Sequence, residues 1–205
     1  MRITQISAHI WRLRIWMLVP IQVWLVVEKD GISLVDAGMS VMAGGILKTL
    51  PRLKAGPLQR ILLTHGHPDH VGALKPLLAK TPVPVYAHRL EIPYLTGERS
   101  YRPKKKAAAV LPPGSIRALP ENGDNQLQAF GGLTPYFAPG HSPGHTVYYH
   151  EKDRVLLAGD LFWSKKGKLL RPRFTADMEE TLRSSAIVSR LQPERLEVCH
   201  GGSVF

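Results

Sequence analysis

The sequence predicts an α/β fold in which two sheets pack face to face and helices cover their outer sides. Segments typical of strands alternate with segments typical of helices. The order of strands followed by helices also occurs twice along the 205 residues. This length allows a large apolar core and suits one domain, so we expect residues 1–205 to form a single domain.

The first half of the chain begins with strands. We expect strands over 3–8, 10–15, 23–28, 32–35, 60–63 and 84–87, and helices over 42–50 and 70–78. The run Lys29-Asp30-Gly31 is typical of a turn between two strands. Pro51 is expected to stop the first helix, because proline lacks the N–H that a helix interior needs.

The apolar run Ile15–Val27 follows Arg12 and Arg14, a pattern also found in secretory signals. No small-residue cleavage site follows it. The run is shorter than the roughly 20 residues of a membrane span, and Pro20 interrupts it. A buried strand that leads into a turn is therefore the better interpretation.

The second half of the chain repeats the theme after a less regular segment. For residues 94–124 we expect one or two helices with loops, and this segment is a candidate lid. Strands are expected over 133–137, 146–150, 155–158 and 195–198. Thr175-Ala176-Asp177 can cap a helix that runs to about Leu191, since Glu179 and Glu180 favour its first turn.

The densest group of metal-binding residue types is the run His65-Gly66-His67-Pro68-Asp69-His70, directly after a short apolar strand. In an extended segment, residues two apart point to the same side, so His65 and His67 can bind one ion together. Asp69 and His70 fall where the next helix begins, within reach of a second ion. Imidazole and carboxylate suit Zn²⁺, and also Fe or Mn. Packing alone hardly explains such a set.

Two ions need more than four ligands, and three further residues follow apolar strands. They are His141 in a Pro-Gly-His-Ser-Pro-Gly-His run, Asp160 after Leu-Leu-Ala-Gly, and His200 before Gly-Gly. Each lies beside small or turn-forming residues, which permit close approach of the backbone. An aspartate directly after a buried strand is also costly unless it is paired or bound to a metal.

These motifs, in this order, resemble the metallo-β-lactamase superfamily, whose fold is a four-layer αββα sandwich. The resemblance covers nearly the whole chain and includes Leu34-Val35-Asp36-Ala37-Gly38, where the family has an aspartate near the site. It implies two Zn²⁺, with Fe or Mn as alternatives. By the resemblance, His65, His67 and His141 hold the first ion, Asp69, His70 and His200 hold the second, and Asp160 bridges them.

The remaining histidines differ in what they suggest. By the same resemblance, His145 orients a ligand from behind, although a surface histidine is an equal alternative. His9, His88 and His150 match no motif, so we assign them no role in the site.

The resemblance also implies a mechanism. A hydroxide that bridges the two ions attacks a carbonyl or phosphoryl centre, and one ion stabilises the developing oxyanion. Asp69 would act as the catalytic residue that passes a proton to the leaving group. We therefore expect a zinc-dependent hydrolase.

Several branches of the superfamily fit poorly. Flavodiiron-type oxygen reductases have a glutamate where this chain has His67, and true β-lactamases generally lack an aspartate at the position of Asp69. The chain has no room for the inserted domain of β-CASP nucleases. Two branches remain close, the glyoxalase II-like thioesterases and the acyl-homoserine lactonases.

Neither of these branches matches in full. Glyoxalase II-like enzymes have basic residues after the bridging aspartate, and here Lys165 lies there, but their C-terminal extension is missing. Lactonases place a tyrosine where this chain has Trp163. We expect hydrolysis of an ester, thioester or lactone bond in a small substrate. A substrate with an anionic group would suit the basic chain. Tyr94, Trp163 and Lys165 are the candidate substrate-binding residues.

The net charge of +11 has two interpretations. The basic segments 99–106 and 165–173 are either solvated surface or a field that attracts an anionic substrate or nucleic acid. Without a cluster of base-stacking aromatic residues, neither nucleic-acid binding nor a phosphodiesterase is the favoured interpretation. A mononuclear iron dioxygenase acting on a persulfide, with a subset of the same ligands, is the other alternative.

The last predictions concern the cellular compartment and the oligomeric state. Cys199 is the single cysteine, which excludes an intramolecular disulfide and favours a reducing compartment. We expect a cytoplasmic protein that does not bind a membrane, as a monomer or a homodimer.

Overall fold

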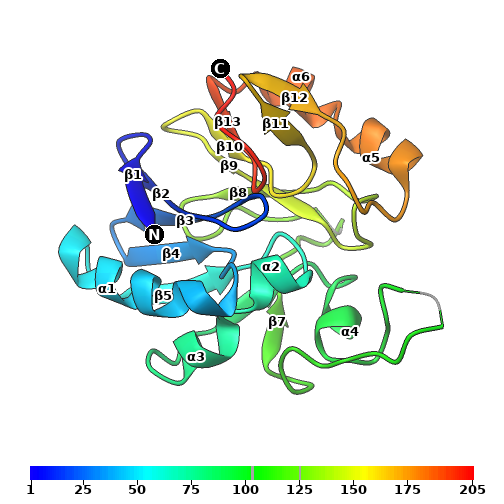
Figure 1. Cartoon of the computed structure of the whole chain (residues 1–205), viewed down its shortest axis with the longest axis horizontal. Coiled ribbons are helices and arrows are strands. Elements are labelled where there is room, and N and C mark those ends of the chain that lie inside the picture. Colours follow the sequence, from blue (N-terminus) through cyan, green and yellow to red (C-terminus); the bar gives the residue numbers. More distant parts are fainter. Residues whose placement is uncertain (103, 125) are drawn as a thin grey trace.

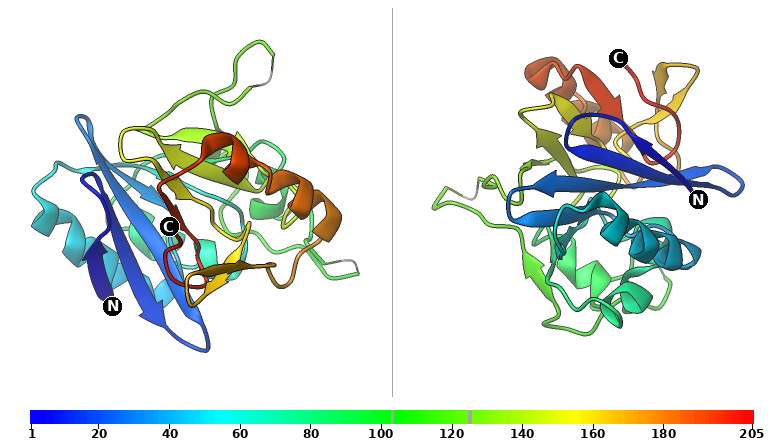
Figure 2. Two further views of the ribbon diagram at one scale, coloured as in Figure 1. Left: turned by 90° about the horizontal axis from the view of Figure 1, so that it is seen from above. Right: turned by 90° about the vertical axis from the view of Figure 1, so that its left-hand side faces the viewer.

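The computed structural model describes residues 1–102, 104–124 and 126–205. Figure 1 shows two sheets stacked on one another, with helices α1 and α3 outside the larger sheet and α5 and α6 outside the smaller one. The right-hand view in Figure 2 shows the same order of layers from another side. The predicted four-layer αββα sandwich is confirmed.

The larger sheet is built from the first part of the chain. Its strands, in spatial order, are β1 (Arg2–Gln5), β2 (Ile10–Trp16), β3 (Pro20–Glu28), β4 (Gly31–Val35), β5 (Leu58–Leu62), β6 (Val85–Ala87) and β7 (Ile116–Ala118). β1 to β4 pair antiparallel, whereas β4 to β7 pair parallel. The carboxyl ends of β4, β5 and β6 therefore meet at one edge of the sheet.

The smaller sheet is built from the last part of the chain. Its strands, in spatial order, are β13 (Arg195–Glu197), β10 (Val155–Leu157), β9 (Thr146–His150) and β8 (Thr134–Phe137). β10 and β13 are parallel, so their carboxyl ends also lie at one edge. A separate hairpin joins β11 (Trp163–Lys165) to β12 (Lys168–Leu170).

The helices are short. They are the 3₁₀ turn η1 (Ser40–Met42), α1 (Ala43–Leu53), α2 (Pro68–Val71), α3 (Leu74–Leu78), α4 (Ile92–Leu95), α5 (Met178–Ser184) and α6 (Ile187–Leu191). Across the described ranges of the chain, no helix has the length and apolar character to span a membrane.

The smaller sheet contributes to two apolar cores. Side chains of a strand alternate between its faces, and β9 shows the result: Tyr148 lies in the large core between the sheets, while Val147 and Tyr149 face a second core under α6. The large core also contains Trp24 of β3, which is fully buried. The run Ile15–Val27 is thus the end of β2, a turn and most of β3, as the strand interpretation predicted.

The prediction that Pro51 stops the first helix is wrong. α1 runs through Pro51 to Leu53, and the backbone turns left-handed at Lys54, with φ of 50°. Proline's fixed φ suits a helix, and what it removes is a single hydrogen bond to the preceding turn. Since Pro51 lies near the end of α1, little of the helix depends on that bond.

Two segments, each predicted to form one helix, contain two helices. The segment 70–78 is divided into α2 and α3, because the Ala73 N–H donates to the Gly38 carbonyl (3.2 Å) on a neighbouring loop. The segment after Asp177 is divided into α5 and α6 at Ser185 and Ala186. Asp177 does cap α5, as its position predicted.

The sequence did not predict three short strands. β7 lies within 94–124, where helices were expected, and α4 overlaps only the start of that segment. β11 and β12 form a hairpin after Asp160. Strands of three residues contain too few positions for an alternating pattern to be recognised.

The cap at Asp177 gives a test of the fold. Its carboxylate accepts a hydrogen bond from the Glu180 N–H at 2.9 Å. Asp177→Ala should lower the free energy of unfolding by about 1 kcal/mol, measured by urea denaturation. Asp177→Ser keeps a side-chain acceptor and should lie close to the parent. Equal losses in both variants would contradict the capping role.

Candidate metal centre

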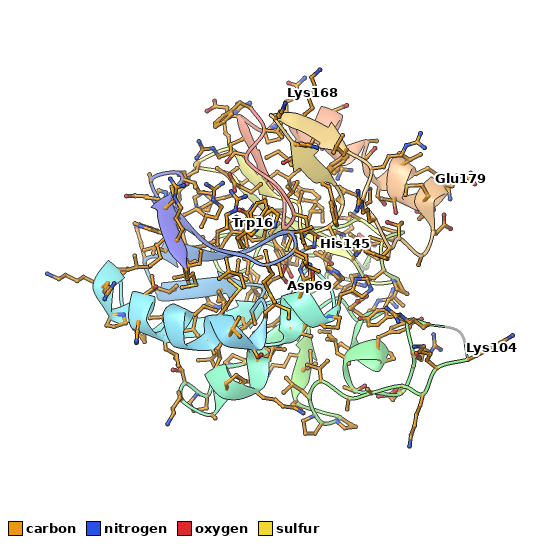
Figure 3. The ribbon with its side chains drawn as sticks, in the orientation of Figure 1. Trp16, Asp69, Lys104, His145, Lys168 and Glu179 are labelled. Carbon is orange, nitrogen blue, oxygen red and sulfur yellow. The ribbon has the colours of Figure 1, made fainter. Side chains whose placement is uncertain are left out.

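The predicted site residues come from loops at the carboxyl ends of strands in both sheets. Asp36 follows β4, the run from His65 to His70 follows β5, Asp160 follows β10, His200 follows β13, and His141 and His145 lie between β8 and β9. In Figure 3, Asp69 and His145 lie near the middle of the molecule, where these loops meet. The structure therefore brings together all nine of the predicted ligands and supporting residues.

Three histidines form a first group. Nε2 of His65 lies 2.9 Å from Nδ1 of His67, and Nε2 of His141 lies 3.2 Å and 3.0 Å from these two atoms. Zn–N bonds of about 2.0–2.1 Å in tetrahedral geometry place ligand nitrogens roughly 3.3 Å apart. Three imidazole nitrogens at nearly this spacing are the arrangement that one ion requires.

Asp69, His70 and His200 form a second group. Nε2 of His200 lies 3.0 Å from Oδ2 of Asp69, and Nε2 of His70 lies 3.8 Å from the same oxygen. The single cysteine, Cys199, has its thiol within 4.8 Å of the ligand atoms of this group. The second group thus contains two nitrogens, a carboxylate and a nearby sulfur.

Asp160 lies between the two groups. Its Oδ2 is 3.6 Å from Nε2 of His141 in the first group and 3.3 Å from Nε2 of His200 in the second. Its Oδ1 is 3.5 Å from Nε2 of His70. Within the described chain, neither Oδ1 of Asp160 nor Nε2 of His70 has a hydrogen-bond partner, although both atoms are buried. Such atoms are costly unless a ligand uses them, so this set of donors fits metal ions.

The ionisation of these side chains also suits a cation. Burial lowers the pKa of His65 well below its usual value and brings the pKa of His67 to about 4, so both are neutral at pH 7. Burial raises the pKa of Asp160, but His70 and His200 outweigh that effect and hold the pKa well below its usual range. Neutral imidazole and ionised carboxylate are the forms that bind metals.

The second group differs in one respect. Burial lowers the pKa values of His70 and His200, but Cys199 and the nearby carboxylates outweigh it and raise both above the usual value. A metal ion that binds these imidazoles must therefore displace a proton, so we expect binding at the second group to weaken as the pH falls.

Asp36 supports the second group from behind. Its carboxylate is fully buried and accepts hydrogen bonds from the Thr64 N–H (2.8 Å), the Thr64 hydroxyl (2.8 Å) and Nδ1 of His70 (2.7 Å). A carboxylate on one ring nitrogen leaves the lone pair of the other directed into the site. Asp36 therefore sets both the tautomer and the direction of His70.

His145 is buried and contacts the site through the backbone. Its Nδ1 lies 3.1 Å from the Ala138 carbonyl, and its Nε2 accepts the Asp160 N–H at 3.2 Å. The alternative that His145 is a surface histidine is therefore wrong, because its ring is fully buried and packs between two loops. Its contact with the Asp160 backbone holds the turn that carries the central carboxylate.

Sequence reasoning missed Glu91, which follows β6 and is fully buried. Its carboxylate accepts hydrogen bonds from backbone N–H groups of both loops that carry the first group, at Gly66 and Gly144. The available signal was a single charged residue in the otherwise apolar run Leu90-Glu91-Ile92-Pro93. Burial raises the pKa of Glu91, and its hydrogen bonds lower it in part.

The three candidate substrate-binding residues are placed differently. Tyr94 is half-buried in α4 and stacks on Tyr101 at 4.7 Å, and Tyr101 lies against His67 with ring centroids 4.9 Å apart. The Trp163 ring lies 4.6 Å from that of His200. Lys165 is exposed at the end of β11.

The basic segments lie mainly on the surface. Lys104 and Lys168 project outward at the edge of the molecule in Figure 3, and the described basic residues of 99–106 and 165–173 are exposed. Arg173 is also exposed but differs from the other basic residues in its position, because its guanidinium lies 5.2 Å from the centroid of the Trp163 ring. One cation therefore lies against the aromatic ring that contacts His200 of the second group.

A further group of histidines lies away from the centre. His9 Nδ1 is 2.7 Å from Asp153, His150 Nε2 is 2.9 Å from Glu28, and the Asp153 N–H donates to His150 Nδ1 at 3.2 Å. Both ring nitrogens of His150 thus have protein partners. The group forms a hydrogen-bonded link between β3 and the turn after β9.

Comparison with known proteins identifies the family. A family model described as the metallo-beta-lactamase superfamily matches residues 16–200. The chain belongs to the metallo-β-lactamase superfamily. The resemblance inferred from the motifs is therefore confirmed, and with it membership of a family of metal-binding hydrolases that act on small molecules.

Individual members of the superfamily are similar at about one third identity. The probable metallo-hydrolase YybB of Bacillus subtilis (strain 168) is 34% identical, over 100% of this chain and 93% of its own. A hydroxyacylglutathione hydrolase of Bdellovibrio bacteriovorus is 31% identical, over 69% of this chain and 48% of that enzyme. The crystal structure of TTHA1623 in a di-iron-bound form has a TM-score of 0.72 and 30% identity, and covers 94% of this chain and 93% of that one.

The contact between Asp36 and His70 yields a prediction. In Asp36→Asn, the amide nitrogen can face Nδ1 of His70, which would move the ring proton to Nε2 and block that atom as a ligand. The affinity for a metal ion at the second group should fall about 10- to 100-fold, measured by competition with a chromophoric chelator. Asp153→Asn, a buried carboxylate away from the centre, is the control and should keep the parent affinity.

Proposed function

We propose that this protein is a hydrolase that cleaves an ester, thioester or lactone bond in a small substrate, with two divalent metal ions as its cofactors. The observation that carries the proposal is the position of Asp160 between two groups of converging imidazole nitrogens. Two ions would supply partners for the buried Oδ1 of Asp160 and Nε2 of His70, which have no hydrogen-bond partner among the described residues.

The proposed ligand sets follow the two groups. His65, His67 and His141 hold the first ion, Asp69, His70 and His200 hold the second, and Asp160 reaches both. We propose zinc as the resident metal, because borderline nitrogen and oxygen donors suit it. The di-iron form of the related TTHA1623 supports iron as the alternative.

When bound, two divalent ions lower the pKa of a shared water toward neutrality and withdraw electron density from the attacked carbonyl. The chain's own residues decide how a substrate meets them. Among the seven proposed ligands, only His67 and Asp69 are partly exposed. The substrate therefore approaches the centre along the His67–Asp69 segment, and the other ligands stay shielded from solvent.

Asp69 is the proposed catalytic residue. Burial raises its pKa, but His70 and His200 outweigh burial and bring it to about 2, so the carboxylate is ionised at neutral pH. Its side chain keeps 28% of its surface exposed, which lets it contact a leaving group. An ionised, partly exposed carboxylate can accept a proton on the water side and release it to the departing oxygen or sulfur.

The surroundings of the second group favour an anionic substrate. Trp163 lies against His200, so an aromatic face adjoins the proposed metal site, and the Arg173 guanidinium lies against that same ring. The related hydroxyacylglutathione hydrolases support a thioester as the substrate class. We propose an anionic thioester or ester as the first substrate class to test.

Four further properties remain predictions: a single domain, a cytoplasmic location, a monomeric or homodimeric state, and the lack of nucleic-acid binding. Each can be measured independently of the activity.

Metal quantification and a substrate screen together test the function. Elemental analysis of the purified protein should give two metal ions per chain, and chelation should abolish activity. The screen should include p-nitrophenyl esters, a glutathione thioester, lactones and phosphodiesters. One iron per chain, with oxygen consumption on a persulfide, would instead establish the dioxygenase. Turnover of phosphodiesters alone would exclude ester, thioester and lactone substrates.

Loss of one first-group ligand is a sharper test. His67→Ala should lower kcat/KM by more than about 100-fold, since removal of a direct ligand exceeds the 10- to 100-fold effect of supporting residues. Bound metal should fall below two per chain, with the circular dichroism spectrum unchanged. His9→Ala, a partly exposed histidine outside the centre, should retain activity and metal content. Two metals and full activity in His67→Ala would refute the ligand assignment.

A further inference from the structure

We infer that Glu91 is a positioning residue, which fixes the ligand loops of the first metal ion and ties them to Tyr101 on the substrate side. The inference rests on the proposed function and extends it to a residue outside the ligand set. Glu91 lies in the turn between β6 and α4, so it comes from a third loop at the same sheet edge as Asp36 and His65.

Glu91 accepts a symmetrical set of hydrogen bonds. Oε1 accepts the Gly66 N–H at 2.9 Å and the Tyr101 hydroxyl, while Oε2 accepts the Gly144 N–H at 2.7 Å and the Ser142 hydroxyl at 2.9 Å. Each carboxylate oxygen therefore binds one backbone N–H and one hydroxyl. One oxygen holds the loop of His65 and His67, and the other holds the loop of His141.

Close approach of these loops requires two glycines. A Cβ on Gly66 would lie 2.2 Å from the Tyr101 hydroxyl oxygen, and a Cβ on Gly144 would lie 2.5 Å from the Glu91 backbone nitrogen. Real Cβ atoms do not approach other atoms so closely, so a side chain in place of Gly144 would meet the Glu91 backbone, and one in place of Gly66 would displace the side chains of Tyr101 and Leu95. The glycines are thus explained by contact with Glu91 and its neighbours, not by a left-handed backbone, since neither has a positive φ.

The charge of Glu91 has no basic partner. In the described ranges of the chain, no lysine, arginine or histidine forms an ion pair with it, and its side chain is fully buried. Four donors stabilise the carboxylate locally. All four donors are neutral, so Glu91 holds the two loops together and does not pair with a charged side chain.

Tyr101 extends the network toward the substrate side. Its hydroxyl donates to Glu91, its ring lies against His67 at 4.9 Å, and it stacks on Tyr94 at 4.7 Å. The position of residues 94–101 over the first group therefore depends on a bond to the same carboxylate that fixes the ligand loops. A change at Glu91 should affect metal affinity and substrate affinity together, whereas a change at Tyr101 should affect mainly the substrate.

Glu91→Gln is the sharpest variant because it keeps the size of the side chain. A hydroxyl can turn to accept from the amide nitrogen, but a backbone N–H cannot, so either Gly66 or Gly144 loses its acceptor. Tyr101→Phe removes only the bond on the substrate side. Glu28→Gln is the matched control, because Glu28 also accepts side-chain hydrogen bonds, from His150 and Lys152, but lies outside the centre.

Metal titration of the full-length protein is the first measurement. With Co²⁺ or Zn²⁺ added to the metal-free protein, Glu91→Gln should weaken binding at the first group about 10- to 100-fold. Tyr101→Phe should keep the parent metal affinity and raise KM. Parent affinity in Glu91→Gln, or equal weakening in Glu28→Gln, would overturn the inference.

Hydrogen exchange of the metal-free protein separates this inference from the proposed function. Loss of one hydrogen bond to the Glu91 carboxylate should speed exchange of the Gly66 or Gly144 amide at least about 10-fold. Unchanged exchange at both amides would overturn the positioning role even if the protein binds two metals. Faster exchange in a protein that binds no metal would instead refute the proposed function and leave Glu91 as an anchor of the loops.

Discussion

Two buried carboxylates hold the segment from Thr64 to His67, and the arrangement of the centre depends on them. Asp36 accepts the Thr64 N–H and Glu91 accepts the Gly66 N–H. The backbone is thus held on both sides of His65, and the side chains of His65 and His67 project together, with Nε2 and Nδ1 2.9 Å apart. A loop would otherwise be the most variable part of the fold, and here buried charge fixes it.

The sheet order explains why these groups can meet. Parallel strands place their carboxyl ends at one edge, and β4, β5 and β6 thereby bring Asp36, the histidine run and Glu91 into adjacent loops. β10 and β13 do the same for Asp160 and His200 in the other sheet. Neither sheet provides a complete set of ligands for two ions. The centre therefore requires the two sheets to stack, which links the apolar core between them to the chemistry at its edge.

The sequence predicted the side chains that would bind metal better than those that position them. His65, His67, Asp69 and His70 are adjacent in the chain, so their combination is visible without a structure. Glu91 is a single carboxylate whose partners are backbone groups of Gly66 and Gly144, and only the fold brings these together. Short strands and divided helices were missed for a related reason, since contacts from other loops, such as Gly38 with Ala73, determine where they end.

The aromatic residues suggest how one centre can serve different substrates. Tyr101 lies against His67 of the first group, and Trp163 lies against His200 of the second, so each group has its own aromatic neighbour. Both rings are half-buried, whereas most of the ligands behind them are buried. Substitutions at the exposed residues around these rings should cost little stability, because surface changes seldom disturb a buried network. Substrate preference can therefore change around Tyr101 and Trp163 while Asp36, Glu91 and Asp160 keep the centre in place.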